Sequence, residues 1–319
     1  MKSHAFCFAL LSAIAIVASV PAQAQNGSLT RSFVSSAGSD SNGCTITAPC
    51  ATFAHAYTLI AANGIIAALD PGKYGPLNIV GPVTVNGNGW AAITGTAQGN
   101  GITVNINGGT GNVILTGLEV DGAGAAYNGI VFESGASLTI SDCILKDFVV
   151  NGGGTGNGIL IAPTSNTNFT VVNTIAVNNG NVGILYSPTS GTPATIGTID
   201  HVVATNNTGS GMGVEVSGGS AAVSISNSVA SNNGSNGIVT SASSGTVTVT
   251  VDNDEISNNE TGLDVTSGTV VLSRSVINNN STYGVSNSGT VDTLLDNRIY
   301  ANGNGNIVQG TALATVTGK

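Results

Sequence analysis

Short stretches in which apolar and polar residues alternate recur along most of the chain. Residues 222–226 and 246–251 are examples, and in both the apolar side chains fall on one side and the Ser and Thr side chains on the other. An Asn or Asp often follows such a stretch, and a further Asn, usually doubled, comes five positions later. The pattern predicts many short strands that are separated by turns at regular places.

A longer repeat joins these stretches, because a Gly followed by an aliphatic residue returns at spacings of 29, 25, 30, 24, 25 and 22 residues. A period near 25 residues with several strands is typical of one coil of a β-helix, whereas a leucine-rich repeat needs a Leu-dominated consensus that is absent. We therefore predict an all-β fold, a right-handed parallel β-helix. The pairs are Gly129-Ile130, Gly158-Ile159, Gly183-Ile184, Gly213-Val214, Gly237-Ile238, Gly262-Leu263 and Gly284-Val285.

The recurrent Asn residues are expected at the corners of the coils. Asn tolerates left-handed backbone angles, and coils stacked at strand spacing, ~4.8 Å, bring equivalent side chains into rows. Stacked amides attract one another whereas stacked like charges repel, which also accounts for the low charge content. Residues 200–207 fit only with one extra residue. The expected structural ladder consists of Asn173, Asn178, Asn206, Asn227, Asn232, Asn258, Asn279 and Asn302.

Residues 25–75 have a different pattern. Residues 51–62 have helix spacing, with Phe53, Tyr57 and Ile60 on one face and an Asn-Gly pair after them. A solenoid needs an atypical terminal unit that covers the open end of its core. We predict an N-terminal cap over residues 25–75, with a strand, a loop and a short helix, followed by the β-helix over residues 76–319.

Residues 1–24 have the features of a secretory signal peptide. Lys2 precedes an apolar run over residues 5–20, and an Ala-Gln-Ala sequence predicts cleavage before Gln25. Export favours a disulfide between Cys44 and Cys50, which flank a short loop. Cys143, with no His near it in the sequence, is expected to be a reduced structural thiol.

Composition narrows the possible partners. Only 7% of the residues are charged, and seven Lys and Arg residues face sixteen Asp and Glu residues, for a net charge of −9. Nucleic acid is excluded as an expected partner because its binding depends on phosphate neutralisation, and anionic lipid fits equally poorly. No apolar stretch of ~18 residues follows the signal, so we expect no membrane insertion after signal cleavage.

Several local motifs recur together in one known group of proteins. They are residues 31–38 (Arg-Ser-Phe-Val-Ser-Ser-Ala-Gly), the two cysteines with Ala-Thr-Phe after the second, residues 69–75 (Leu-Asp-Pro-Gly-Lys-Tyr-Gly), and repeats that end in Asn-Asn-Gly. On these motifs, essentially the whole mature chain resembles exported bacterial right-handed β-helix repeat proteins of the pectate-lyase-like superfamily. The resemblance implies an architecture but no reaction, because the superfamily contains lyases, hydrolases, epimerases and non-catalytic adhesins.

The best local grouping of charged residues consists of Asp252, Asp254, Glu255, Arg274 and Arg298, and the candidate catalytic residues within it are Asp254, Arg274 and Arg298. Arg274 replaces a corner Asn, and alignment by coil places Asp254 and Arg298 in one column, two coils and ~10 Å apart. A carboxylate beside a cation is what a polysaccharide lyase needs for metal binding and for its base. An ordinary surface ion pair is the alternative.

Glu255 raises a question of register. With Asn253 as the corner, it falls in a column that is expected to point inward, and a buried unpaired carboxylate is costly. A shift of one residue, with Asp254 as the corner, would turn Ile256 inward and Glu255 outward, and we expect this shift. The column consists of Ile144, Ile175, Val229, Val276 and Ile299.

No motif predicts a metal or cofactor site, and calcium is expected only if the chain is a lyase. Thr246, Thr248 and Thr250 lie along one strand, and we expect no recurrence of Thr from coil to coil. The sequence favours a secreted protein, periplasmic or extracellular, that is non-catalytic and either structural or carbohydrate-facing. The alternative is a polysaccharide lyase or glycoside hydrolase. A polysaccharide is the expected partner, and the strand-like residues 311–319 leave an edge through which the chain could form oligomers.

Overall fold

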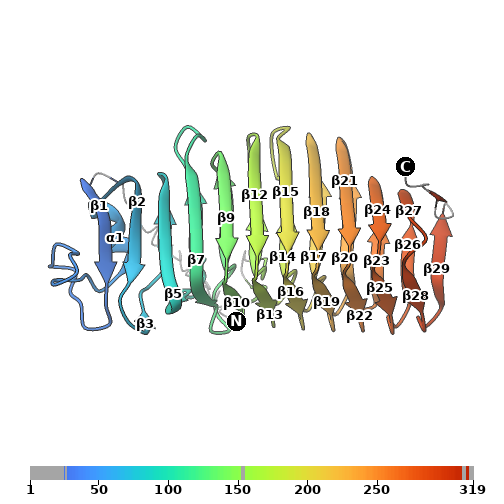
Figure 1. Ribbon diagram of the computed structural model, residues 1–319, viewed down its shortest axis with the longest axis horizontal. Coiled ribbons are helices and arrows are strands. Elements are labelled where there is room, and N and C mark those ends of the chain that lie inside the picture. The colour runs from blue at the N-terminus through green and yellow to red at the C-terminus, as the bar shows by residue number, and fades with distance from the viewer. Residues whose placement is uncertain (1–24, 26, 152–154, 311–313, 316–319) are drawn as a thin grey trace, which may run out of the picture.

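The chain folds as a solenoid in which parallel strands stack side by side along one axis (Figure 1). The structure is a computed structural model, and it describes residue 25 and residues 27–151, 155–310 and 314–315. The signal peptide expected over residues 1–24 therefore lies outside the described residues. The predicted fold class, an all-β parallel β-helix with one short helix at its N-terminal end, is confirmed.

Each coil contributes strands to three ladders. The long-strand ladder contains β1 (Leu29–Val34), β2 (Ile60–Ala68), β5 (Val83–Thr94), β7 (Asn112–Asp121), β9 (Ser137–Ser141), β12 (Thr167–Val172), β15 (Ala194–Asp200), β18 (Ser220–Ser226), β21 (Thr246–Asp252), β24 (Thr269–Ser273), β27 (Thr290–Thr293) and β30 (Ala314–Thr315). The short-strand ladder contains β3 (Gly72–Lys73), β10 (Ile144–Lys146), β13 (Ile175–Val177), β16 (Val203–Thr205), β19 (Val229–Ser231), β22 (Glu255–Ser257), β25 (Val276–Asn278) and β28 (Arg298–Tyr300). The ten-stranded sheet contains β4 (Leu77–Ile79), β6 (Ile102–Asn105), β8 (Ile130–Ser134), β11 (Ile159–Ile161), β14 (Ile184–Tyr186), β17 (Met212–Val216), β20 (Asn236–Ala242), β23 (Thr261–Val265), β26 (Tyr283–Asn287) and β29 (Gly305–Gly310).

Inward-facing aliphatic residues stack from coil to coil and form the core. In the ten-stranded sheet Ile159 pairs with Ile130 on one side and Ile184 on the other, and all three are at most 1% exposed. Such columns remove apolar surface from water along the whole length of the solenoid, at ~25 cal/mol for each Å² buried. The β-branched residues that form them also fit the pleated strand conformation.

In the six coils that contain β9, β12, β15, β18, β21 and β24, two corners place a residue in the left-handed region. The first precedes the short-strand ladder, and its φ values lie between 49° and 60°. The second follows that ladder, and five of its residues are Asn. Asn and Asp tolerate this region better than other side chains, which explains why they recur there. The first-corner residues are Asp142, Asn173, His201, Asn227, Asn253 and Arg274; the second-corner residues are Asp147, Asn178, Asn206, Asn232, Asn258, Asn279 and Ala301.

Two alignments made from sequence are wrong by one or two residues. The first-corner residue of the β15 coil is His201, five positions before Asn206, so no extra residue is present. The glycine equivalent to Gly183 is Gly211, because Met212 pairs with Ile184, whereas Gly213 pairs with Leu185. Both errors have one cause: His and Met occupy positions at which the neighbouring coils carry Asn and Ile.

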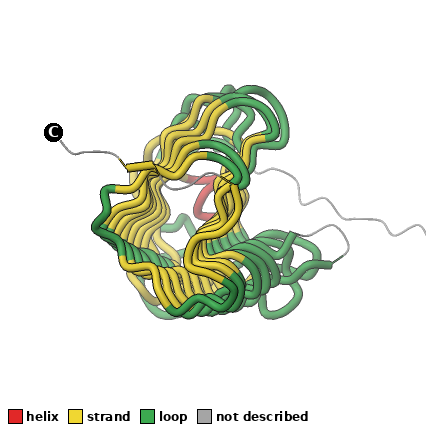
Figure 2. The backbone as a smooth tube through the Cα atoms, turned by 90° about the vertical axis from the view of Figure 1, so that its right-hand side faces the viewer, coloured by secondary structure: helices red, strands yellow, loops and turns green. Residues whose placement is uncertain are grey.

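The N-terminal end of the core is covered by helix α1 (Phe53–Leu59) (Figure 2). Phe53 and Tyr57 are fully buried, and the Tyr57 hydroxyl accepts hydrogen bonds from the backbone N–H groups of Val80 and Gly81 at 2.9 and 2.7 Å. The helix is shorter than predicted, because Ile60 already begins strand β2, which pairs with β1 and β5.

The predicted disulfide between Cys44 and Cys50 is present and holds the loop in front of α1. Cys143 is buried without a disulfide, and burial raises the pKa of its thiol to about 12, which disfavours the nucleophilic thiolate. Among the described residues, no helix has the length and apolar character needed to cross a membrane.

Candidate functional site

The three residues that sequence alignment grouped as catalytic do not come together. Asp254 is 3% exposed and follows the first corner, where its Oδ1 accepts a 2.7 Å hydrogen bond from the N–H of Ser228 and its Oδ2 a 3.0 Å hydrogen bond from the N–H of Asp252. Ser275 occupies the next place in its column, as predicted, and its Oγ accepts from the N–H of Asp254 at 3.1 Å. The place after Ser275 is held by Asn297, not Arg298, since the Asn297 Oδ1 accepts from the N–H of Ser275 at 2.8 Å. The Asp254 carboxyl therefore completes backbone hydrogen bonds inside the corner.

Arg274 and Arg298 lie on the outside of the solenoid in different surroundings. The guanidinium group of Arg274 binds the Asp252 carboxylate in an exposed ion pair. Arg298 pairs in register with Val276, and Val276 pairs with Glu255, so Arg298 belongs to the column of Glu255. The predicted alignment of Asp254 with Arg298 is one residue out of register.

The expected register shift at Glu255 does not occur, although its consequence for the side chains is correct. Asn253 is the corner residue, with φ 60°. Glu255 nevertheless points outward and Ile256 inward, because the whole column points outward: Ile144 and Ile175 in the same column are 37% and 38% exposed. The column was predicted to point inward because most of its residues are aliphatic and alternate with polar ones, although Ile144 and Ile175 are in fact exposed.

A buried amide ladder runs along the solenoid, one residue beyond the second corner. The Asn179 Nδ2 donates to the Asn207 Oδ1 at 2.9 Å, and the same bond links each later pair at 2.9–3.1 Å. Each of these five accepting oxygens also accepts from the backbone N–H of the Asn in the preceding coil. The ladder consists of Asn179, Asn207, Asn233, Asn259, Asn280 and Asn302.

Of the Asn residues predicted for the ladder, only Asn302 belongs to this buried row. The second-corner side chains of Asn232 and Asn258 instead lie near the hydroxyl of the preceding Ser. First-corner side chains of the described residues bond to one another across coils in two places, since Asn253 donates to Asn227 at 2.8 Å and Asn173 to Asp142 at 3.3 Å. The doubled Asn gave the signal, and its second member has the buried role.

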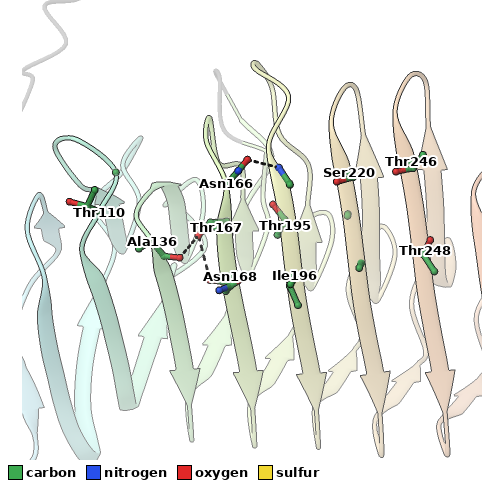
Figure 3. Close-up of a pocket in the computed structure, with 14 residues that line it drawn as sticks. Thr110, Ala136, Asn166, Thr167, Asn168, Thr195, Ile196, Ser220, Thr246 and Thr248 are labelled. Carbon is green, nitrogen blue, oxygen red and sulfur yellow. Dashed lines mark hydrogen bonds between the residues drawn. The ribbon is translucent and has the colours of Figure 1, made fainter.

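A groove lies across the beginnings of β12, β15, β18 and β21, and we call it the hydroxyl groove (Figure 3). Its volume is about 490 Å³. In the middle of it Ile196 is 64% exposed and pairs with Asn168 on one side and Ala222 on the other. None of the residues that line it is charged. They are Gly109, Thr110, Ala136, Asn166, Thr167, Asn168, Ala194, Thr195, Ile196, Ser220, Ala221, Ala222, Thr246 and Thr248.

Hydroxyl side chains recur from coil to coil on this face, contrary to the sequence expectation. Thr170 pairs with Thr139 and Thr198, and Ser224 pairs with Thr198 and Thr250, two residues further along the strands than the column of Ile196. Because side chains two residues apart share a face, this row points to the same side as Ile196. The two columns form an uncharged surface of hydroxyl, amide and methyl groups beside the groove.

The chain was compared with known proteins. No protein-family description and no curated protein matches its sequence. Among solved structures it is similar to pectate lyase Pel9A, with a TM-score of 0.53 and 16% identity over 84% of this chain and 69% of that one. It is also similar to the mannuronan C-5 epimerase AlgE4 A-module of Azotobacter vinelandii, with a TM-score of 0.45 and 13% identity over 81% and 91%. A comparison with a rhamnogalacturonan lyase gives a TM-score of 0.39 and 12% identity over 79% of this chain and 75% of that one.

The chain has a parallel β-helix fold like that of Pel9A. The likeness to Pel9A concerns the fold alone, since the sequences share so few residues. The chemistry of this β-helix depends on its own side chains.

Two carboxylates stand at the far ends of the strands that form the hydroxyl groove. Neither is among the three candidate catalytic residues chosen from the sequence, although Asp252 belongs to the wider grouping of charged residues. Asp200 on β15 and Asp252 on β21 both pair with Ser226, so they lie two coils, ~9.6 Å, apart. Asp200 accepts hydrogen bonds from Ser226, Asn227 and His201 at 2.7–2.8 Å, and the bonds from Asn227 and His201 in particular lower its pKa to about 2.

The carboxylate of Asp252 is also bound by hydrogen-bond donors. It accepts hydrogen bonds from Arg274 and from the hydroxyl of Ser273, and the bond from Arg274 is the main cause of its lowered pKa. A general acid must hold a proton near neutral pH, so neither Asp252 nor Asp200 is arranged for that role. Their signal in the sequence was an Asp as the last residue of a strand, which is also typical of a turn.

The ten-stranded sheet of this β-helix bends inward between two sets of loops (Figure 2). Leu185 and Val239 point outward there but are only 9% exposed. Glu215 and Asp264 lie among them, and burial raises the pKa of both carboxyl groups. Neither forms an ion pair among the described residues. Burial thus raises the pKa of both acids, but no cation among the described residues forms an ion pair with either of them.

Among the described residues, one group of three possible metal ligands has the spacing for an ion: Cys44, Cys50 and His55. The two sulfur atoms are joined in the disulfide, so they are not thiolate ligands. The arrangement is therefore that of a structural loop.

Proposed function

We propose that this β-helix is an exported, non-catalytic carbohydrate-binding protein, and that the hydroxyl groove holds its glycan. The observation that carries the proposal is the composition of the groove. An exposed aliphatic residue, Ile196, offers an apolar platform to the C–H face of a sugar ring. Asn and Thr side chains around it can exchange hydrogen bonds with sugar hydroxyls.

Two further observations support a role without turnover. The carboxylates nearest to the groove on the same strands are held ionised by Asn, Ser, His and Arg side chains. Asp254, Arg274 and Arg298 point to different surroundings, so they provide no acid, base and cation at one point. Export is supported by the disulfide, since disulfides persist in oxidising compartments.

The test is binding to an immobilised panel of neutral, amino and acidic glycans, combined with assays for new reducing ends and unsaturated uronates. We expect binding without product formation, and Ile196→Asp should weaken it at least ~10-fold, which corresponds to ~1.4 kcal/mol. Ile175→Asp is the matched control, because Ile175 is an exposed aliphatic strand residue on the short-strand ladder. Equal loss of binding in both variants would contradict the groove as the site.

A second candidate function, a polysaccharide lyase or hydrolase, is favoured by one observation. Asp200 and Asp252 share a face and lie two coils apart, a separation at which two carboxyl groups can act on one sugar. Turnover of any glycan that disappears in Asp252→Asn, with the protein still folded, would support this candidate against our proposal.

A further inference from the structure

We infer that the hydroxyl groove selects a neutral, extended glycan and discriminates against polyuronates. This inference rests on the proposed function and adds the substrate class. It differs from what the printed names of the similar solved structures suggest, since pectate and mannuronan are polymers of uronic acids.

The groove offers no group that could neutralise a uronate carboxylate. All its lining side chains are uncharged. Transfer of a carboxylate from water into a groove without a cation or a dedicated set of N–H donors costs several kcal/mol, whereas a sugar hydroxyl needs only one hydrogen-bond partner to be compensated. The lining thus favours hydroxyl-bearing sugars over carboxyl-bearing ones.

The surroundings of the groove add to this discrimination. On the same face Asp200 and Asp252 are ionised, and their partners His201 and Arg274 are already engaged with them. Among the described residues, the exposed Arg31 on β1 is a cation of the same ladder, but four strand spacings, ~19 Å, separate β1 from β9. That distance exceeds the Debye length at physiological salt, ~8 Å, so Arg31 exerts little attraction on a polyanion in the groove.

The remaining described cations point elsewhere. Lys146 binds Glu119 at 2.7 Å on the short-strand ladder, where Arg298 also lies. Lys73 pairs in register with Ala92 on β5, and Ala92 pairs with Glu119 on β7. The ends of β5 and β7 thus continue the short-strand ladder, because Glu119 also pairs with Ile144 on β10. With a net charge of −9 for the whole chain, the long-range field also repels an acidic polymer and lowers its association rate.

The repeat of the groove fits a chain that runs along the solenoid axis. Equivalent outward positions on β12, β15, β18 and β21 are occupied by Asn168, Ile196, Ala222 and Thr248, one for each coil. Two coils span ~9.6 Å, which is close to the length of a β-1,4-linked disaccharide in an extended glycan. The polar residues at both ends of this row would meet sugar hydroxyls, and the two apolar residues between them would meet a ring face.

The experiment is calorimetric titration of the full mature protein with oligosaccharides of equal length: cellohexaose, xylohexaose and laminarihexaose as neutral probes, and hexagalacturonic acid as the acidic probe, with calcium and with EDTA. We expect at least one neutral hexaose to bind ~10-fold or more tightly than hexagalacturonic acid, a difference of ~1.4 kcal/mol or more. Equal or tighter binding of hexagalacturonic acid would overturn the inference but leave the proposed function standing. Binding of no probe, together with no binding on the glycan panel, would overturn both.

A gain-of-function variant sharpens the result. Ala222→Lys places a cation in the middle of the groove at an exposed strand position, and we expect it to increase the affinity for hexagalacturonic acid ~10-fold. Ile175→Lys, on the other ladder, should leave that affinity unchanged. If Ala222→Lys is unstable in thermal unfolding, Thr248→Lys serves the same purpose at another exposed position. An unchanged affinity in both folded groove variants would contradict the role of groove charge.

Discussion

The Oδ1 atom of Asp254 accepts a hydrogen bond of 2.7 Å from the backbone N–H of Ser228, its counterpart in the preceding coil. Neutral oxygens do the same elsewhere in this column: Ser228 accepts from the N–H of Val202, and Asn297 accepts from the N–H of Ser275. A carboxylate is therefore not required for the corner, and its negative charge is placed where only 3% of the residue is exposed.

The first prediction concerns the pH dependence of stability. Burial is the main cause that raises the pKa of Asp254 to about 7 in the folded state, from an ordinary value near 4 in the unfolded state. The folded state then binds more protons between these values, so the free energy of unfolding should fall as pH rises from ~4 to ~7. Asp254→Asn should remove this decline and be more stable than the wild type at pH 8 by ~1–3 kcal/mol, with little difference at pH 4.

Urea unfolding at pH 4 and pH 8 measures this, and Asp252→Asn is the control of opposite sign. The Arg274 side chain lowers the pKa of Asp252, so the stability from its charge is present at neutral pH and is lost as pH falls. Asp252→Asn should thus be slightly less stable than the wild type at pH 8. An Asp254→Asn variant with the wild-type pH profile would refute a titrating Asp254.

The second prediction concerns the buried amide ladder. The Asn233 side chain accepts from Asn207 at 3.0 Å and donates to Asn259 at 3.0 Å and to the carbonyl of Ala204 at 3.1 Å. Asn233→Ala leaves these buried groups unpaired and should lower the free energy of unfolding by ~3 kcal/mol. Chemical denaturation of the variant measures the loss.

The neighbouring corner residue offers a matched control. Asn232 has φ 56°, which Gly adopts readily, and its side chain is exposed. Asn232→Gly should change stability by no more than ~0.5 kcal/mol. If Asn232→Gly cost as much as Asn233→Ala, the outer Asn would be the residue that holds the coils together.

The third prediction concerns the N-terminal cap. The Cys44–Cys50 disulfide closes a short loop next to α1, and both cysteines are fully buried. Replacing both by Ser should lower stability by ~2–3 kcal/mol, because the unfolded chain regains freedom and buried polar groups replace the sulfur atoms. Hydrogen exchange should show the loss as faster opening of β1 and α1, with the coils around β18 unchanged. Uniform acceleration along the solenoid would contradict a local role.

The fourth prediction concerns Arg274. Its side chain is exposed and its φ is 49°, a value that Asn adopts more easily. Arg274→Asn loses a surface ion pair but relieves the backbone, so its free energy of unfolding should stay within ~0.5 kcal/mol of the wild type. Glycan binding should also be unchanged. A loss of binding or of any turnover in this variant would return Arg274 to the functional site.

The sequence by itself determined the architecture. The period near 25 residues, the alternation of Val and Ile with Ser and Thr, and the Asn residues five positions apart are local signals, because each reflects the conformation of one strand or one turn. The cap helix was predicted from its local spacing in the same way, and its disulfide from two cysteines that flank a short loop in a chain expected to be exported. The division at residue 75 stays a prediction, and the stacking passes through it without interruption, since β2 pairs with β5.

Only the tertiary structure decided which residues share a column and which side of the wall they face. Coil lengths vary, so alignment by sequence was wrong by one residue at Asp254 and Arg298, and the recurrence of Thr170, Thr198 and Thr250 was missed. Alternation with a period of two predicts that successive side chains of a strand point to opposite faces, but it does not predict which face is turned to the core. That choice depends on how the three ladders close around one core, and the uncharged groove beside Ile196 is a consequence of it.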